Sequence, residues 1–179
     1  EKGMVGKPLR VMVVGIPNVG KSSFINRIGG GNKAKVENRP GVTRGNQWFT
    51  VDKQLELLDT PGVLWPKFED ETTGLFLAAT GAIKDSILDI ETLAARFAVK
   101  LAECAPEAFC KRYKLNNEEI NGLPMYELLE LIGKKRGFLI SGGEIDLERS
   151  ANILLDEFRG GKIGRITLER PSDERCRIF

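Results

Sequence analysis

Eight consecutive residues near the start of the chain combine glycine, lysine and serine at a spacing suited to phosphate binding. They are Gly15-Ile16-Pro17-Asn18-Val19-Gly20-Lys21-Ser22, and they match the pattern GxxxxGK[ST]. Glycines let the backbone wrap a phosphate without a Cβ clash, and the loop amides and the start of the following helix attract the anion. Lys21 can reach the β- and γ-phosphates of a nucleotide, and Ser22 can hold Mg²⁺. We therefore predict a phosphate-binding loop that includes Ser23, and we favour it over an ordinary glycine-rich turn.

A second candidate segment, Asp59-Thr60-Pro61-Gly62, directly follows the apolar run 55–58. A carboxylate at the end of a strand can approach Mg²⁺ through water, and a glycine can bring its backbone N–H close to a γ-phosphate. By itself, Asp-Thr-Pro-Gly is also a good turn sequence. Its position downstream of the phosphate-binding loop favours the functional interpretation, in which Asp59 supports the metal and Gly62 lies at the γ-phosphate.

A threonine lies between these two segments, in Pro40-Gly41-Val42-Thr43-Arg44. Its hydroxyl could complete the Mg²⁺ shell when a triphosphate is bound; the alternative is a plain loop threonine. The order of loop, threonine and DxxG is that of the GTPase switch segments. We assign Lys21, Thr43 and Gly62 to catalysis, which would rest on positioning and charge stabilisation. Ser22, Thr43 and Asp59 are the predicted Mg²⁺ residues.

The residues after Asp59 give a more specific signal than the loop. Asp59-Thr60-Pro61-Gly62-Val63-Leu64-Trp65-Pro66-Lys67-Phe68, with Gly81-Ala82-Ile83-Lys84-Asp85, resembles the ribosome biogenesis GTPase A family of circularly permuted P-loop GTPases. The similarity extends from about Arg10 to Glu169. It implies an α/β P-loop GTPase fold followed by a small, mostly helical domain. It also implies GTP and GDP as ligands, GTP hydrolysis in late assembly of the large ribosomal subunit, binding to its rRNA, and release on hydrolysis.

Two positions set this chain apart from Ras-like GTPases. Val63 stands where many GTPases carry a glutamine that positions water, and an aliphatic side chain cannot orient water by hydrogen bonding. The family is similar in having a hydrophobic residue here, so its members need another group, often a monovalent cation. Asn18 matches the loop asparagine that helps to hold K⁺ in potassium-dependent relatives. The resemblance thus implies a K⁺ role for Asn18, with turn formation as the alternative.

A guanine-reading motif of the form [NT]KxD is missing from the sequence. Asn32-Lys33-Ala34-Lys35 lacks the aspartate and lies too close to the loop. In permuted family members the guanine-reading motifs precede the P-loop, so we expect a longer protein whose N-terminal half completes the G domain. We expect this chain alone to be weak or inactive as a GTPase. An ATP-dependent P-loop enzyme and a non-enzymatic RNA-binding module stay open as alternatives.

The elements that must position these residues follow from the hydrophobic pattern. The nearly continuous apolar run 9–14 predicts a strand buried on both faces, in a mainly parallel sheet. A helix over 21–28 should end at three glycines, and two strands over 47–51 and 55–58 should be joined by a turn at Asp52-Lys53. The remaining expected elements are helices around 71–80, 89–103, 106–113, 124–135 and 146–158, and a short strand over 163–168.

These patterns divide the chain into a P-loop half of a G domain at 1–70, a helical domain at 71–170 and a tail at 171–179. The helical part carries no recognisable catalytic cluster, and the resemblance implies that it contacts rRNA. The candidate contacts are Lys134, Lys135, Arg136, Arg159, Lys162 and Arg165. Phosphate contacts would supply affinity that is independent of sequence, although basic residues also suit a helix C-terminus. We expect Trp48, Trp65 and Phe68 to be core or interdomain anchors rather than RNA-stacking groups.

The amino-acid composition excludes several further classes of protein and of active site. Hydrophobic residues make up 41% and charged residues 29%, which is typical of a folded globular protein, and a net charge of +2 gives no global signature of polyanion binding. The chain has no histidine, which excludes histidine triads, general bases and metal sites within it. Its 3 cysteines form no CxxC pair, so a reducing, cytoplasmic location fits better than a disulfide scaffold. No apolar run approaches the roughly 18 residues of a membrane helix, so we expect no membrane partner. A mitochondrial relative stays open beside a bacterial one.

Overall fold

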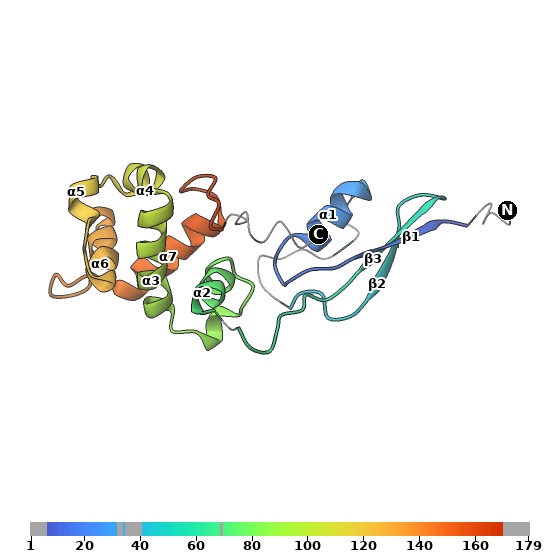
Figure 1. The fold of residues 1–179 in the computed structure, drawn as a ribbon, viewed down its shortest axis with the longest axis horizontal. Helices are drawn as coiled ribbons and strands as arrows, with labels where there is room; N and C mark the ends of the chain where they lie inside the picture. Colours follow the sequence, from blue (N-terminus) through green and yellow to red (C-terminus); the bar gives the residue numbers. More distant parts are fainter. Residues whose placement is uncertain (1–6, 32–33, 35–40, 69, 170–179) are drawn as a thin grey trace. The chain divides into compact units, whose positions relative to one another are not determined.

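The computed structural model describes residues 7–31, 34, 41–68 and 70–169, which form two compact units (Figure 1). Unit 1 contains the described residues up to Asp70 together with Gly81–Lys84; unit 2 contains Glu71–Thr80 and the described residues from Asp85 onward. Several residues named above lie outside the described part: Asn32, Lys33, Lys35, Pro40 and the tail 171–179. Among the described helices, none is both long and apolar enough to cross a membrane.

Unit 1 is built on a three-stranded mixed sheet in the order β1–β3–β2. Its elements are β1 (Leu9–Val13), α1 (Lys21–Ile28), β2 (Gln47–Thr50) and β3 (Leu55–Asp59). β1 runs parallel to β3, and β2 runs antiparallel to β3, to which it is joined by the predicted turn. The parallel register pairs Val13 with Asp59. The phosphate-binding loop and the DxxG segment therefore leave the sheet side by side, at the edge where parallel strands place ligand-binding loops.

Helix α1 covers one face of this sheet, and a small core lies between them. Ile25 of α1, Leu57 of β3 and Ala34 form this core and are at most 5% exposed. The helix begins directly after Gly20, whose φ of 91° is a left-handed conformation that glycine adopts without a steric penalty. It spans the residues that the sequence predicted, because the loop and the glycines that bound it are local signals.

The other face of the sheet is open, which corrects the prediction that the strand at 9–14 is buried on both faces. Met12 is 60% exposed, and Trp48 of β2 is 52% exposed. Within the described residues, β1 pairs with β3 only and forms an edge of the sheet. The prediction failed because β1 has the apolar composition of an interior strand but occupies an edge here. Trp48 and Trp65 are also not core residues, since both are exposed to solvent.

Unit 2 is a bundle of helices arranged around α3 (Figure 1). α3 packs against α2, α4, α6 and α7, and α6 also packs against α7. The helices are α2 (Glu71–Ala79), α3 (Ile90–Cys104), α4 (Pro106–Tyr113), α5 (Asn117–Ile120), α6 (Met125–Arg136) and α7 (Leu147–Arg159), with a 3₁₀ turn at Asp85–Ile87. Phe97, Leu101 and Leu154 are fully buried at the centre. This unit therefore supplies a hydrophobic core of its own.

The ends of these helices follow from capping residues in the sequence. The Asp89 carboxylate accepts a hydrogen bond from the Thr92 amide at 3.1 Å and begins α3, and Asp146 begins α7 in the same way. α6 ends at Gly137, whose φ is 70°. Inside α6, a Cβ at Gly133 would overlap the side chain of Ser150 in α7, so the glycine allows the close approach of these helices.

Two features of unit 2 differ from the sequence prediction. The strand predicted at 163–168 does not form. Ile163 is buried at 6% exposure, and the described residues of unit 2 provide only an isolated bridge between Leu139 and Ile145, so no strand is available for it to join. Helix α5 was not predicted, because four residues are too short to show a helical period.

Candidate functional site

Three polar side chains from separate segments of unit 1 meet at the end of the sheet. They are Ser22 in α1, Thr43 in the loop before β2, and Asp59 at the end of β3. The Ser22 hydroxyl donates a hydrogen bond to Asp59 Oδ2 at 2.7 Å, and the Thr43 hydroxyl donates to the same oxygen at 3.2 Å. The two hydroxyl oxygens lie 3.2 Å apart. The structure thus brings together the three residues that the sequence assigned to Mg²⁺.

Asp59 is buried, and its two oxygens have different surroundings. The side chain is 2% exposed, and no described residue provides a hydrogen-bond partner for Oδ1. An unsatisfied buried carboxylate oxygen is costly unless another group binds it. Hydroxyl and carboxylate oxygens are the donors that Mg²⁺ prefers. The three side chains therefore fit a Mg²⁺ ion, although no group of three His, Cys, Asp or Glu residues forms a metal site in the described chain.

The phosphate-binding loop connects β1 to α1, and its lysine lies over the loop. Lys21 Nζ donates hydrogen bonds to the carbonyl oxygens of Gly15, at 3.1 Å, and Ile16, at 2.8 Å. Burial lowers the pKa of Lys21, and the nearby negative charge of Asp59 partly offsets this effect. Asn18 has a φ of 58°, a left-handed conformation that asparagine tolerates better than most residues. Asn18 therefore shapes the turn of the loop.

The DxxG segment packs directly against this loop. A Cβ on Gly62 would overlap the backbone of Pro17, so the close approach requires glycine. The Val63 amide donates to the Gly15 carbonyl oxygen at 3.3 Å, while the Val63 side chain is 72% exposed. Beside the loop, Val14, Ile16, Pro61 and Trp65 contribute to a mostly apolar hollow of about 710 Å³. The two segments therefore share a contact at the edge of the sheet.

Two positioning residues escaped the sequence analysis. The Thr60 hydroxyl donates to the Val13 carbonyl oxygen at 2.7 Å and ties the start of the DxxG segment to β1. Asn26 makes two hydrogen bonds to the backbone of Ala34, at 2.8 and 2.7 Å, which fasten the chain after α1. Asparagine is an unfavourable residue inside a helix, and this was the available signal that the Asn26 side chain has a specific partner.

The basic residues proposed for RNA contact fall into two groups of three. Lys135 pairs with Glu119 at 2.9 Å, Arg136 with Glu157 at 2.6 Å, and Arg159 with Asp85 at 2.7 Å. Arg159 also donates to the Ala79 carbonyl oxygen at 2.9 Å. These three side chains hold unit 2 together. The side chains of Lys134, Lys162 and Arg165 are exposed and have no ion-pair partner among the described residues.

With this geometry in place, comparison with known proteins assigns the family. A family profile described as "50S ribosome-binding GTPase" matches residues 10–119, which include the loop, Thr43 and the DxxG segment. The chain belongs to the 50S ribosome-binding GTPase family. This assignment confirms the P-loop GTPase fold that the sequence resemblance implied.

Relatives in this family extend beyond the present chain. A Bacillus cereus protein named ribosome biogenesis GTPase A is 48% identical over 174 residues, which is 96% of this chain and 57% of the relative. A Thermotoga maritima protein of the same name is 34% identical over 92% of this chain and 57% of the relative. The chain therefore spans somewhat more than half the length of these curated relatives.

Two solved structures of the Thermotoga maritima protein YlqF share the family fold. The GDP-bound structure aligns with a TM-score of 0.60 at 30% sequence identity, and covers 93% of this chain and 62% of the other. The GNP-bound structure aligns with a TM-score of 0.58 and covers 92% of this chain. The family fold is thus known in complex with two guanine nucleotides.

Proposed function

We propose that the protein containing this chain hydrolyses GTP to GDP and phosphate during late assembly of the large ribosomal subunit. The observation that carries the proposal is the meeting of Ser22, Thr43 and Asp59 beside a phosphate-binding loop. The family assignment favours guanine over adenine nucleotides, and so favours a GTPase over an ATP-dependent enzyme. The names of the relatives support a role in ribosome assembly.

Each residue of the site has a defined task in this proposal. The backbone N–H groups of the loop 15–22, except at Pro17, bind the phosphates together with the start of α1. Lys21 exchanges its loop carbonyls for the β- and γ-phosphate oxygens. Ser22 and Thr43 would hold Mg²⁺, which would neutralise phosphate charge, and Asp59 positions both hydroxyls through its hydrogen bonds. Gly62 places its N–H near the γ-phosphate. Val63 cannot orient water, so catalysis depends on positioning and on charge supplied by other groups, including K⁺ near Asn18.

Guanine recognition and the rest of the sheet belong to a further part of the protein in this proposal. The exposed edge of β1 and the open face containing Met12 and Trp48 support this, because an apolar strand is stable when other strands or helices cover it. That further part would carry the [NT]KxD motif.

We further propose that unit 2 contributes to rRNA binding through its uncommitted cations. Lys162 and Arg165 are the remaining candidates. Lys135, Arg136 and Arg159 are engaged within unit 2, and Lys134 lies beside the carboxylates of Glu127 and Glu130, which disfavour a phosphate. Contacts of Lys162 and Arg165 with phosphates would weaken with salt. This role would place the protein in the cytoplasm, where bacterial ribosomes are assembled.

The test is GTP hydrolysis by the full-length protein, measured as phosphate release with and without purified large ribosomal subunits. We expect slow intrinsic turnover and a rise of at least about tenfold with the subunit, because the particle supplies groups that this site lacks. The Lys21→Ala variant should remain inactive in both conditions. Equal wild-type rates with and without the subunit would refute the assembly role.

A further inference from the structure

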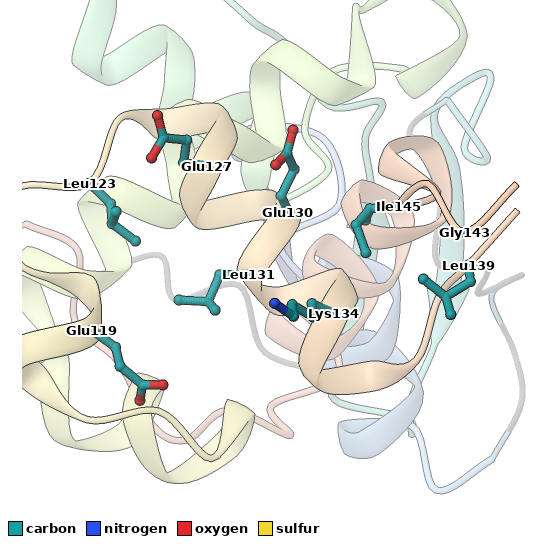
Figure 2. A pocket seen from close by; sticks show the side chains of 9 residues that line it. All are labelled: Glu119, Leu123, Glu127, Glu130, Leu131, Lys134, Leu139, Gly143 and Ile145. Carbon is teal, nitrogen blue, oxygen red and sulfur yellow. The ribbon is translucent and has the colours of Figure 1, made fainter.

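Unit 2 contains a groove of about 980 Å³ that the proposed nucleotide chemistry does not use. The residues that line the groove come from α5, α6 and the turn between α6 and α7. Figure 2 labels these lining residues. The α6 residues in the lining are Glu127, Glu130, Leu131 and Lys134. They are spaced so that they share one face of the helix. The opposite face, which carries Leu128 and Ile132, is buried in the bundle.

The floor of this groove is aliphatic. Leu139 and Ile145 pair across an antiparallel bridge, which places their side chains on the same face of the turn. Leu139 is 56% exposed, and Leu123 and Leu131 are half-buried nearby. Contiguous exposed apolar side chains bordered by polar groups are typical of interaction surfaces. The groove therefore has an apolar centre for a partner to cover.

The rim of the groove is predominantly acidic. Glu119 already pairs with Lys135, whose hydrogen bond is the main cause that lowers the pKa of Glu119. Glu127 and Glu130 are exposed, and no described residue forms an ion pair with either. Lys134 is the single basic residue of the described lining. A surface with this balance attracts cationic groups and repels phosphates.

We propose that this groove docks a cationic, amphipathic segment of a partner protein. Aliphatic side chains of that segment would cover Leu131 and Leu139, and its lysines or arginines would pair with Glu127 and Glu130. This arrangement is the helix-in-groove mode of recognition. The inference rests on the proposed assembly role, because proteins that bind rRNA carry Lys and Arg to neutralise its phosphates. The phosphates of RNA would instead be repelled by the carboxylates of the rim.

The first test uses the full-length protein and a synthetic peptide in fluorescence anisotropy. The peptide is a helix of about 16 residues with leucines at i, i+3, i+4 and i+7 and lysines on both sides of that stripe. We expect micromolar binding to the wild type, and a loss of at least about tenfold in the double variant Glu127→Lys/Glu130→Lys. The matched control is Glu107→Lys/Asp156→Lys, which reverses two exposed carboxylates outside the groove with the same change in net charge and should change affinity less than about twofold.

Two further comparisons separate docking from simple charge attraction. A peptide of the same composition, with its leucines spread around the helix, should bind at least about fivefold more weakly. Leu139→Ser, at an exposed position, should weaken the striped peptide and leave the far-UV circular dichroism spectrum unchanged. Absence of peptide binding or equal binding by the double variant would each overturn the proposal. A dimer that is lost in the double variant would assign the groove to a second copy instead.

The second test identifies the occupant on the particle itself. A photo-crosslinking amino acid replaces Leu139 in the groove or, as the control, Ile87, which is 73% exposed elsewhere in unit 2. With purified large subunits, we expect the groove position to crosslink to a lysine- and arginine-rich protein segment, and the control to give a different pattern. Crosslinking to rRNA alone would contradict the inference. Since the peptide assay contains neither nucleotide nor ribosomal particles, its failure is distinguishable from failure of the GTPase proposal.

Discussion

The two units each bury a carboxylate, and they surround it in opposite ways. Asp59 in unit 1 is 2% exposed and receives hydrogen bonds at Oδ2, whereas no described residue contacts Oδ1 with a donor. Glu157 in unit 2 is 5% exposed, and both its oxygens accept hydrogen bonds from Arg112 and Arg136, at 2.5 to 2.9 Å. The free oxygen of Asp59 leaves room for a further group, as the proposed Mg²⁺ site requires, whereas the fully bonded Glu157 supports the fold of unit 2.

The charge state of Glu157 follows from this difference. Burial alone would raise the pKa of Glu157, but its hydrogen bonds from Arg112 and the positive charges of Arg136 and Arg112 outweigh burial and lower it. The glutamate therefore stays ionised and fixes α4 and α6 to α7. It also neutralises Arg136, which the sequence had offered as an RNA contact. The comparison shows that a basic residue in a helical domain must be checked for internal partners before it is assigned to RNA.

The largest expected effect is on nucleotide affinity, from the unit 1 substitution Lys21→Ala in the full-length protein. Loss of the ammonium should weaken GDP and GTP binding by about 100-fold, because charge-assisted hydrogen bonds contribute up to about 3 kcal/mol each. Fluorescent-nucleotide titration measures the change. Lys53→Ala, in the exposed turn between β2 and β3, is the control and should bind normally. Unchanged affinity in Lys21→Ala would refute the phosphate-binding assignment.

In unit 2, the substitution that tests the buried carboxylate is Glu157→Gln, and it should lower stability. We expect a loss of about 2–3 kcal/mol in the free energy of unfolding, because two guanidinium groups lose their anion; the partial exposure of both arginines keeps the effect below that of a fully buried pair. Urea denaturation followed by circular dichroism gives the value. Glu103→Gln removes an exposed ion pair with Lys100 and should cost less than about 0.5 kcal/mol. Similar losses in both variants would contradict the role of Glu157 as a buried anion that stabilises unit 2.

The Glu157→Gln variant also tests how the stability of unit 2 depends on pH. Because the folded-state pKa of Glu157 is lowered, its contribution to stability is fully present above its unfolded-state pKa of about 4.3 and is lost as the pH falls through the folded-state value. The difference in stability between wild type and Glu157→Gln should therefore be constant at neutral pH and shrink below about pH 4. A difference that grows on acidification would show that the carboxylate is not stabilised in its ionised form.

A smaller effect is expected where the two loops of unit 1 touch. Gly62→Ala places a methyl group against the backbone of Pro17, so it should displace the DxxG segment. We expect hydrolysis in the presence of large subunits to fall by about tenfold, since small displacements of positioning groups are costly to catalysis. Gly45→Ala is the matched control, because a Cβ there meets no neighbour within 4 Å. Full activity in Gly62→Ala would mean that this contact does not position the site.

The sequence predicted the parts of the site that depend on local spacing. The loop, helix α1 and the DxxG segment were found because each is set by neighbouring residues, and the parallel pairing of β1 with β3 explains why Ser22 and Asp59 meet. The exposure of β1 could not be predicted, since it depends on which strands are its neighbours. The roles of Thr60 and Asn26 were missed because they too depend on the fold. Thr60 bonds to backbone that is distant in sequence, and Asn26 bonds to backbone in a loop.

The most direct test of the account is a titration of this 179-residue chain with fluorescent GDP in the presence of Mg²⁺, competed by unlabelled GDP or ADP. If Gly15–Ser22, Thr43 and Asp59 form a phosphate and Mg²⁺ site and guanine is recognised elsewhere in the protein, GDP and ADP should compete equally well. Removal of Mg²⁺ should then weaken binding, and substitution of Lys21 by alanine should weaken it by about 100-fold. Absence of binding to the intact chain would contradict the site, and strong selectivity for GDP would contradict the proposal that guanine recognition lies in another segment.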